Sequence, residues 1–157
     1  LFLFTSAGIR AQNEKTVYTY STGVFSVNTL SESQGNGNAK ILIGATPEMQ
    51  EKYLPDGTFP NAVNAFFVKT PDHTILIDAG FGRKLFDNLK ELNTTPAQVD
   101  IILLTHMHGD HIGGLLRDGK KAFPNAVLYI SRVEHDYWIK EGKEAQVNVI
   151  NIYKDKL

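Results

Sequence analysis

Polar and apolar residues alternate along the first part of the chain. Residues 15–33 follow this period and are rich in Val, Tyr, Phe and Thr, which predicts two strands that break at Thr22 and Gly23. Residues 31–40 follow as a predicted loop, because Gly and Asn suit positive φ angles. Thr46 precedes a proline and a glutamate, a pattern typical of the start of a helix.

A hairpin is predicted next, over residues 62–70 and 73–80. Its second strand is almost continuously apolar, as expected for a strand covered on both faces. The hydrophobic period then lengthens from that of a strand to that of a helix, and the apolar stripe from Leu85 to Leu92 predicts a helix. A short helical turn is expected at Thr95, which precedes a proline.

The remaining sequence alternates between strands and helices. Residues 99–105 predict another fully apolar strand, and a helix is expected to begin at Ile112. A further strand precedes Ser131, which forms a predicted capping box with Glu134 for a helix that stops at Gly142. This order indicates one α/β domain, a mixed sheet with covering helices, in which functional sites lie at strand ends.

Composition narrows the classes of partner. The 157 residues are 42% hydrophobic and 21% charged, with a formal net charge of -1, which is ordinary for a soluble globular domain. We expect a small-molecule substrate, because no excess charge indicates a nucleic acid or an anionic membrane as a partner. Beyond the N-terminal segment no stretch approaches the roughly 18 apolar residues of a membrane span, so no stable membrane association is expected. The absence of cysteine excludes disulfides, thiolate zinc sites and thiol catalysis.

Both ends of the chain depart from the pattern of a complete domain. Residues 1–11 are apolar, then small, and lead into a polar segment from Gln12, which is typical of the tail of a secretory signal peptide. A buried first strand is the alternative. The signal peptide predicts a periplasmic or secreted protein. Residues 148–157 stop in mid-pattern without a cap or polar tail, so we expect truncation at both ends.

Three of the five histidines and an aspartate crowd into one short segment, "THMHGDH". His106 and His108, two residues apart in an extended segment, point the same way and can reach one metal ion. Asp110 and His111 follow a turn at Gly109 and can bind a second ion close by. Imidazole and carboxylate ligands without sulfur suit Zn²⁺, or Mn, Fe or Co. Two such ions about 3.5 to 4 Å apart can hold a hydroxide between them and polarise a substrate oxygen.

The two other histidines carry no comparable signal. His73 falls in the predicted hairpin turn, and His135 falls in the first turn of a predicted helix. An isolated histidine in such a position is more often a loop or helix residue than a ligand. We therefore do not expect either of them in the metal site.

The motif "THMHGDHIGG" resembles the His-x-His-x-Asp-His signature of the metallo-β-lactamase superfamily, and "ILIDAGFG" resembles the strand that carries a structural aspartate in that family. Similarity to the branch of methyl parathion hydrolases and lactonases extends from about Ala62 to Trp138. The resemblance implies an αββα sandwich with a two-metal site at one edge of its sheets. It also implies a small-molecule hydrolase.

Residue roles follow from the resemblance. His106 and His108 are expected to bind the first Zn²⁺, and Asp110 and His111 the second. Asp110 is also expected to orient the attacking hydroxide. Asp78 is expected to accept hydrogen bonds that hold the metal loop; the alternative is a strand-end carboxylate that caps the following turn.

Two further pairs of residues have alternative interpretations. Gly113 and Gly114 are expected to let a following helix pack close under the metals, or to be ordinary turn glycines. Tyr137 and Trp138 are candidates for the pocket wall, although aromatic residues on a helix are more often part of the core.

The chain departs from the family pattern after the motif. The family's third histidine for the first metal, its bridging carboxylate and its final histidine lie downstream, and residues 114–157 do not supply them. Residues 12–157 are therefore expected to be the N-terminal half of the sandwich. We expect the chain alone to bind metal weakly, to expose an apolar sheet face and to lack activity.

The expected activity of the parent protein is hydrolysis of a lactone, ester or phosphoester by a hydroxide bound between two metals. Two alternatives remain open: hydrolysis of β-lactams, and an RNA-processing or non-hydrolytic role on the same metal fold. The pattern gives no indication of the oligomeric state.

Overall fold

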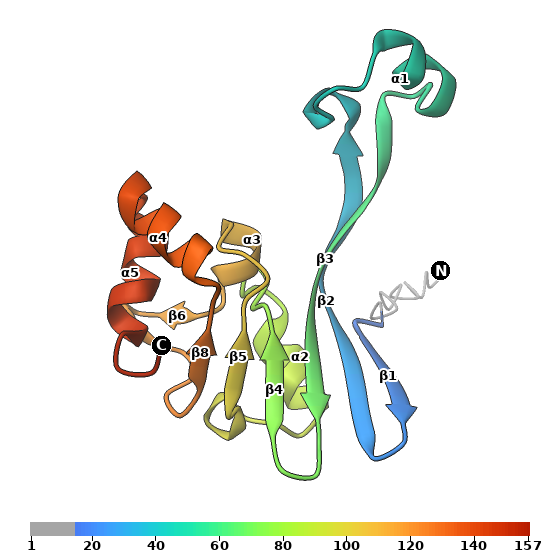
Figure 1. Ribbon diagram of the computed structural model, residues 1–157. Coiled ribbons are helices and arrows are strands. Elements are labelled where there is room, and N and C mark those ends of the chain that lie inside the picture. The colour runs from blue at the N-terminus through green and yellow to red at the C-terminus, as the bar shows by residue number, and fades with distance from the viewer. Residues whose placement is uncertain (1–14) are drawn as a thin grey trace, which may run out of the picture.

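A six-stranded mixed sheet forms the centre of the fold (Figure 1). The computed structural model describes residues 15–157, so the predicted signal peptide at residues 1–11 lies outside the described part. The strand order is β1-β2-β3-β4-β5-β8, antiparallel from β1 to β4 and parallel from β4 to β8. The strands of this sheet are β1 (Val17–Thr22), β2 (Phe25–Asn38), β3 (Thr58–Lys69), β4 (Thr74–Ile77), β5 (Ile101–Leu103) and β8 (Val127–Tyr129).

Helices connect and cover the strands, which confirms the predicted mixed sheet with covering helices. The helices are α1 (Pro47–Tyr53), α2 (Leu85–Glu91), α3 (Gly109–Ile112), α4 (Arg132–Glu141) and α5 (Glu144–Tyr153), with short 3-10 turns at Ala39–Ile41 and Pro96–Gln98 and a small hairpin of β6 (Leu116–Arg117) and β7 (Lys120–Lys121). Among the described residues, no helix is long and apolar enough to span a membrane.

The core lies between the sheet and the helices. Phe67, Leu76, Ile102 and Leu128 come from four neighbouring strands and are buried on one face, because alternate side chains of a strand point to the same side. The helices contribute the other half of this core with Leu85, Leu89, Val149, Ile150 and Tyr153. The predicted amphipathic stripe of α2 thus packs as expected.

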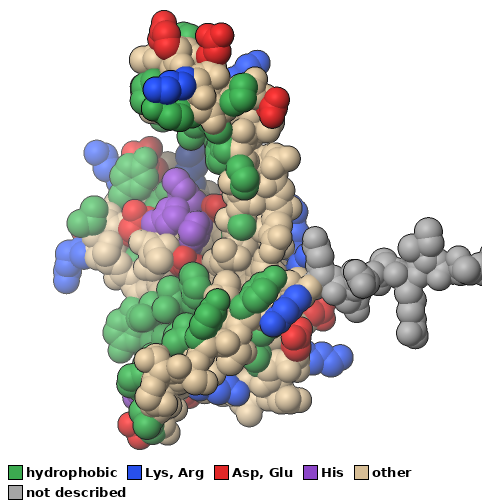
Figure 2. All heavy atoms as spheres, turned by 90° about the vertical axis from the view of Figure 1, so that its right-hand side faces the viewer, with side chains coloured by type: hydrophobic (Ala, Val, Ile, Leu, Met, Phe, Trp, Pro, Cys, Tyr) green, Lys and Arg blue, Asp and Glu red, His purple; other side chains and the backbone are tan. Residues whose placement is uncertain are grey.

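The opposite face of the sheet is apolar and open. Phe66, Ile77, Leu103 and Tyr129 are neighbours across the same four strands, and Tyr129 is 54% exposed. Figure 2 shows hydrophobic side chains gathered below the histidine cluster. The expectation that this chain exposes an apolar sheet face is confirmed for the described residues.

Strands β2 and β3 extend well beyond the other strands and form an arm (Figure 1). The predicted loop over residues 31–40 is wrong, because β2 continues to Asn38, which pairs with Thr58 of β3. The register shifts between Ser31 and Ser33, where a bulge bends the strand. Gly and Asn are poor strand formers, and here pairing with β3 overrides their preference.

The tip of the arm carries α1. As predicted, the Thr46 side chain accepts a hydrogen bond from the Met49 N–H and caps this helix. However, α1 has no buried residue. The apolar side chains of Ile41, Ile43 and Tyr53 are exposed at the same tip, so backbone pairing rather than a core maintains this part of the fold.

The predicted helix start at Ile112 is wrong. The helix α3 begins earlier, at Gly109, and ends at Ile112, and the following segment leads into β6. A Cβ on Gly113 would lie 2.7 Å from the Phe81 carbonyl oxygen, and one on Gly114 would lie 2.5 Å from that of Ala79. These two glycines therefore allow close packing of two backbones, although they follow a helix instead of starting one.

The last helix, α5, was not predicted. Its N-cap, Lys143, makes no side-chain cap hydrogen bond, so the usual start signal is missing. Its Gln146, Val149, Ile150 and Tyr153 are buried. Tertiary packing of this face compensates for the weak local signal.

Candidate metal centre

The histidines of the motif lie in the connection from β5 to α3. His106 and His108 belong to the irregular segment after β5, and Asp110 and His111 belong to α3. The ring centroid of His106 lies 4.6 Å from that of His108 and 3.9 Å from that of His111. The turn at Gly109 thus brings all three imidazoles to one place, the end of a buried strand.

Asp78 anchors this segment from the neighbouring strand. It follows β4, is 5% exposed, and adopts a positive φ of 58°. Its Oδ1 accepts from the Thr105 N–H at 2.9 Å, and its Oδ2 accepts from the Thr105 hydroxyl at 2.8 Å. The same Oδ2 lies 2.8 Å from His111 Nδ1. Because β4 and β5 are parallel neighbours, their ends meet here.

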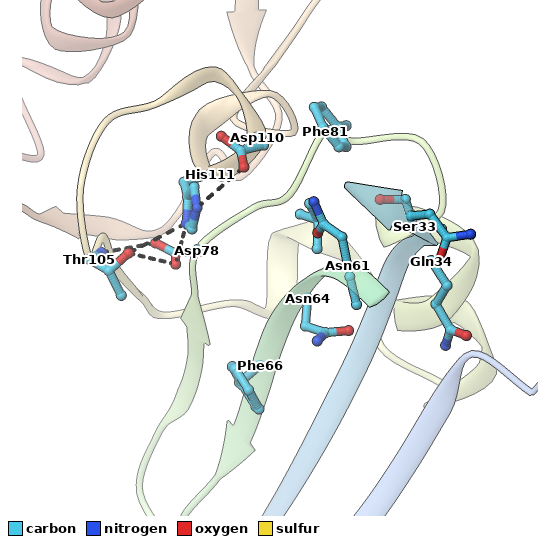
Figure 3. Close-up of a pocket in the computed structure, with 14 residues that line it drawn as sticks. Ser33, Gln34, Asn61, Asn64, Phe66, Asp78, Phe81, Thr105, Asp110 and His111 are labelled. Atoms are coloured by element: carbon cyan, nitrogen blue, oxygen red, sulfur yellow. Dashed lines mark hydrogen bonds and ion pairs between the residues drawn. The ribbon is translucent and has the colours of Figure 1, made fainter. Parts of the chain in front are cut away.

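The contact with Asp78 fixes how His111 presents its ring. A carboxylate only accepts hydrogen bonds, so Nδ1 carries the proton and the lone pair is on Nε2. This Nε2 lies 3.6 Å from Asp110 Oδ2. His111 and Asp110 thus present a nitrogen and an oxygen side by side, as Figure 3 shows.

A second carboxylate holds the segment from the other side. The Oε2 of Glu134 accepts from the Met107 N–H at 2.9 Å and from the Trp138 indole N–H at 2.8 Å. Burial raises the pKa of this carboxyl, but the two hydrogen bonds outweigh burial, and the pKa is lower than usual. The predicted capping box is only half formed: Ser131 accepts from the Glu134 N–H, while the Glu134 carboxylate turns to Met107.

A third carboxylate, Glu32, was not anticipated by the sequence analysis. It lies at the bulge of β2, is 1% exposed, and accepts from the backbone N–H groups of Arg83 and Lys84, both at 2.9 Å. These bonds hold the loop before α2, which contains Phe81. Glu32 lies where the predicted strand (residues 15–33) and the predicted loop (residues 31–40) overlap, so no burial signal distinguished it.

A pocket of about 590 Å³ opens between the histidine motif and the arm. Figure 3 shows His111, Asp110, Asp78 and Thr105 on one side, with Asn61, Asn64 and Phe66 of β3 across from them. The full lining consists of Ser33, Gln34, Gly35, Asn36, Asn61, Ala62, Val63, Asn64, Phe66, Asp78, Phe81, Thr105, Asp110 and His111. Sequence reasoning missed the arm side, because its Asn and Gln residues are typical of loops.

Tyr137 and Trp138, the two candidates for the pocket wall, lie elsewhere. Neither Tyr137 nor Trp138 lines the pocket. Trp138 packs against the core, and its ring lies edge-on at 5.9 Å from the ring of His108. The alternative interpretation of Trp138 as a core residue is therefore correct, while Tyr137 is exposed.

His111 is the motif histidine that lines the pocket, while His106, His108, His73 and His135 are not part of its lining. His73 belongs to the turn between β3 and β4, where its carbonyl accepts from the Thr70 N–H at 2.9 Å. His135 lies near the start of α4, with its Nδ1 2.8 Å from Asp136 Oδ1. Both have the local roles expected of isolated histidines.

The ligand atoms of the motif suit divalent metal ions, both in their type and in their arrangement in pairs. Three imidazoles and a carboxylate gather at one end of the sheet, and Asp78 leaves the His111 Nε2 free to coordinate. Among residues 15–157, however, no three or more His, Asp or Glu side chains are arranged to hold one ion. The described residues thus supply pairs of metal ligands, which are fewer than one ion needs.

Solved structures share this fold. The crystal structure of hydrolase AbOPH in the beta lactamase superfamily matches with a TM-score of 0.73 and 29% identity, over 91% of this chain and 56% of that chain. AidC, a dizinc quorum-quenching lactonase in complex with the product N-hexnoyl-L-homoserine, matches with a TM-score of 0.71 and 25% identity, over 90% of this chain and 60% of that one.

Curated relatives match over shorter segments. Hydroxyacylglutathione hydrolase of Aeromonas salmonicida is 32% identical over 84 residues, which are 50% of this chain and 32% of the relative. Exodeoxyribonuclease WalJ of Streptococcus pneumoniae is 43% identical over 53 residues, which are 33% of this chain and 20% of the relative. This chain thus spans a third or less of these two proteins.

The family itself is shown by a broader match. The sequence model of the Metallo-beta-lactamase superfamily matches residues 58–152, which is more than half of the chain. This range includes the motif, Asp78, the helices α2 to α4 and all but the last residue of α5. The chain therefore belongs to the metallo-beta-lactamase superfamily.

Proposed function

We propose that the protein containing this chain is a metal-dependent hydrolase of lactones, esters or phosphoesters. The observation that carries the proposal is the position of the motif: Asp110 and His111 line a pocket large enough for a small molecule. When bound, two Zn²⁺ ions, or Mn, Fe or Co ions, lower the pKa of water toward neutrality and polarise a carbonyl or phosphoryl oxygen.

The residues of this chain have distinct roles in the proposal. His106 and His108 hold one ion, and His111 and Asp110 hold the other. Asp110 also orients the attacking water, because its carboxylate lines the pocket and accepts hydrogen bonds. Since the described residues contain only ligand pairs, the remaining ligands come from elsewhere in the protein.

The arm side of the pocket supports an uncharged polar substrate. Gln34, Asn61 and Asn64 place carboxamides opposite the motif, and Phe66 adds an apolar surface. Carboxamides donate and accept hydrogen bonds without adding charge, which suits the oxygens of a lactone, an ester or an uncharged phosphotriester. The lactonase and the hydroxyacylglutathione hydrolase among the similar proteins are in keeping with this substrate class.

A nucleic-acid substrate is the second candidate, because an exodeoxyribonuclease is among the similar proteins. Binding to a phosphate backbone depends on Lys and Arg side chains. The pocket lining, within the described part of the chain, has neither. The proposal therefore favours a small molecule over DNA or RNA.

The test is hydrolysis by the full-length protein loaded with Zn²⁺. Aryl esters, lactones and an aryl phosphotriester are the probe substrates, and we expect turnover of at least one. We expect His106→Ala to abolish this turnover. His73→Ala is the matched control, since His73 lies in a hairpin turn, and it should retain full activity.

Three results would contradict the proposal or redirect it. Retention of wild-type turnover by the His106→Ala protein would refute the role of the motif. Turnover of nitrocefin alone would assign the protein to the β-lactam alternative. Salt-sensitive RNA retention in a filter-binding assay, without turnover of small substrates, would support the nucleic-acid candidate.

A further inference from the structure

Met107, the residue between His106 and His108, is held at both of its backbone polar groups. Its N–H donates to Glu134 Oε2 at 2.9 Å. Its carbonyl oxygen accepts from the Gln146 side-chain amide, also at 2.9 Å. Its own side chain is fully buried. The middle residue of the motif is thus fixed in place between two histidines whose ring centroids lie 4.6 Å apart.

The two groups that hold Met107 come from separate helices. Glu134 lies in the first turn of α4, and Gln146 lies on the buried face of α5. Both helices follow the motif in the sequence and pack against one another and the core. A helix side chain is a firmer support than another loop, because its backbone is already hydrogen-bonded.

Glu134 is itself held. The Trp138 indole N–H donates to the same Oε2 at 2.8 Å, and Trp138 lies one helical turn after Glu134. The helix cap does not use the carboxylate, since Ser131 accepts from the Glu134 N–H without a return bond. A glutamate that the sequence places in a capping box is instead directed at the histidine segment.

We propose that Glu134 is a positioning residue for the metal centre: through the Met107 N–H it fixes the peptide that sets the directions of His106 and His108. The inference rests on the proposed function, in which these histidines bind a metal ion. The chemistry required of residue 134 is a hydrogen-bond acceptor of the right length. Its negative charge is not required.

Two conservative variants test the side-chain length and the negative charge of residue 134 separately. Glu134→Gln keeps the length and the acceptor oxygen but removes the charge. Glu134→Asp keeps the charge but is one carbon shorter, so its oxygen no longer reaches Met107. Positioning by a hydrogen bond predicts that Glu134→Gln behaves as wild type and that Glu134→Asp does not. Both changes are mild enough for the chain to fold.

The first measurement is hydrogen exchange of the Met107 amide in the metal-free full-length protein. We expect protection in wild type and Glu134→Gln, and a loss of about tenfold or more in Glu134→Asp, because the buried N–H loses its acceptor. This readout does not depend on metal. Equal protection in the two variants would refute the hydrogen bond as the positioning contact.

The second measurement is Zn²⁺ affinity, followed by the fluorescence of Trp138, the only tryptophan of the sequence. Its ring lies 5.9 Å from that of His108, so it reports on the site. We expect the dissociation constant to rise about 10-fold in Glu134→Asp and to change less than about 3-fold in Glu134→Gln, as for groups that orient metal ligands.

The exposed Glu141 at the far end of α4 provides matched controls, Glu141→Gln and Glu141→Asp, which should change neither readout. Loss of Met107 protection with unchanged Zn²⁺ affinity would overturn the positioning role. If the wild-type full-length protein binds no Zn²⁺, the proposed function fails, and the exchange data alone decide whether Glu134 fixes Met107.

Discussion

The arm and the body of this protein share two strands but differ in what stabilises them. In the body, β3, β4, β5 and β8 bury Phe67, Leu76, Ile102 and Leu128 beneath helices. In the arm, the far halves of β2 and β3 are paired through their backbones, and α1 at the tip buries nothing. Hydrogen bonds alone give a defined shape, whereas the buried apolar area supplies most of the stability.

The pocket lies where these two regions meet. The body contributes Asp110 and His111 of the motif, and the arm contributes Asn61, Asn64 and Gln34. Figure 2 shows the histidines in the hollow between the arm tip above and the apolar sheet face below. The proposed ligand residues thus lie on the packed body, while the opposite wall lies on the arm, whose tip helix buries no residue.

The largest expected effect distinguishes the packed body from the arm, which has no core of its own. Phe123 is fully buried in the body, 6.0 Å from Phe86 in a stacked arrangement. We expect Phe123→Ala to reduce the free energy of unfolding by about 3 to 5 kcal/mol, because a large cavity is left. Ile43 at the arm tip is fully exposed, and Ile43→Ala should change the free energy of unfolding by less than about 0.5 kcal/mol. Urea denaturation measures the free energy of unfolding of both variants. Equal losses would contradict the distinction between a packed body and an arm without a core.

The next effect tests the anchor of the motif. In Asp78→Asn, an amide N–H would face His111 Nδ1, so the proton moves to Nε2 and this nitrogen can no longer bind metal. We expect Zn²⁺ affinity to fall about 10- to 100-fold by titration. Asparagine tolerates the positive φ of residue 78, so backbone strain is unchanged. Asn61→Ala on the arm side is the control and should leave the affinity unaltered.

Alkaline pH should weaken the body through Tyr153. Burial raises the pKa of this phenol to about 12, and its hydroxyl donates to the Leu115 carbonyl at 3.0 Å. The neutral form is therefore favoured in the folded state. This contribution is complete below the unfolded pKa of about 10 and is lost as the pH rises toward 12.

The variant Tyr153→Phe removes the titrating group. Wild type should lose thermal stability between about pH 10 and pH 12 relative to this variant, which calorimetry can measure. Parallel melting curves of the two proteins over this range would show that Tyr153 does not carry the effect.

The smallest effect compares two helix caps of the same kind. Ser131 caps α4 and Thr46 caps α1, each by accepting a backbone N–H. We expect Ser131→Ala to cost about 1 kcal/mol in global stability. Thr46→Ala should leave global unfolding unchanged and raise only the amide exchange of α1, because this helix opens without the body. A lower melting temperature in Thr46→Ala would show that the arm and the body unfold together.

Particular elements show where sequence reasoning succeeded. The apolar period predicted β4, β5 and α2, because these elements bury one face or both and their side chains report it directly. The loop predicted over residues 31–40 and the missed α5 show the opposite case. There the secondary structure depends on pairing with a partner strand or on packing against the core. The intrinsic helix and strand propensities of the residues do not reveal such distant contacts.

The sequence by itself determined the class of fold, the crowding of His106, His108, Asp110 and His111 at a strand end, and the family that this motif indicates. The tertiary structure alone decided that Glu134 from α4 and Gln146 from α5 also hold that motif. It also decided that the arm lines the pocket. The physical reason is that ligand chemistry is a property of residue type and spacing, whereas a supporting hydrogen bond between residues distant in the chain exists only once the fold brings them together.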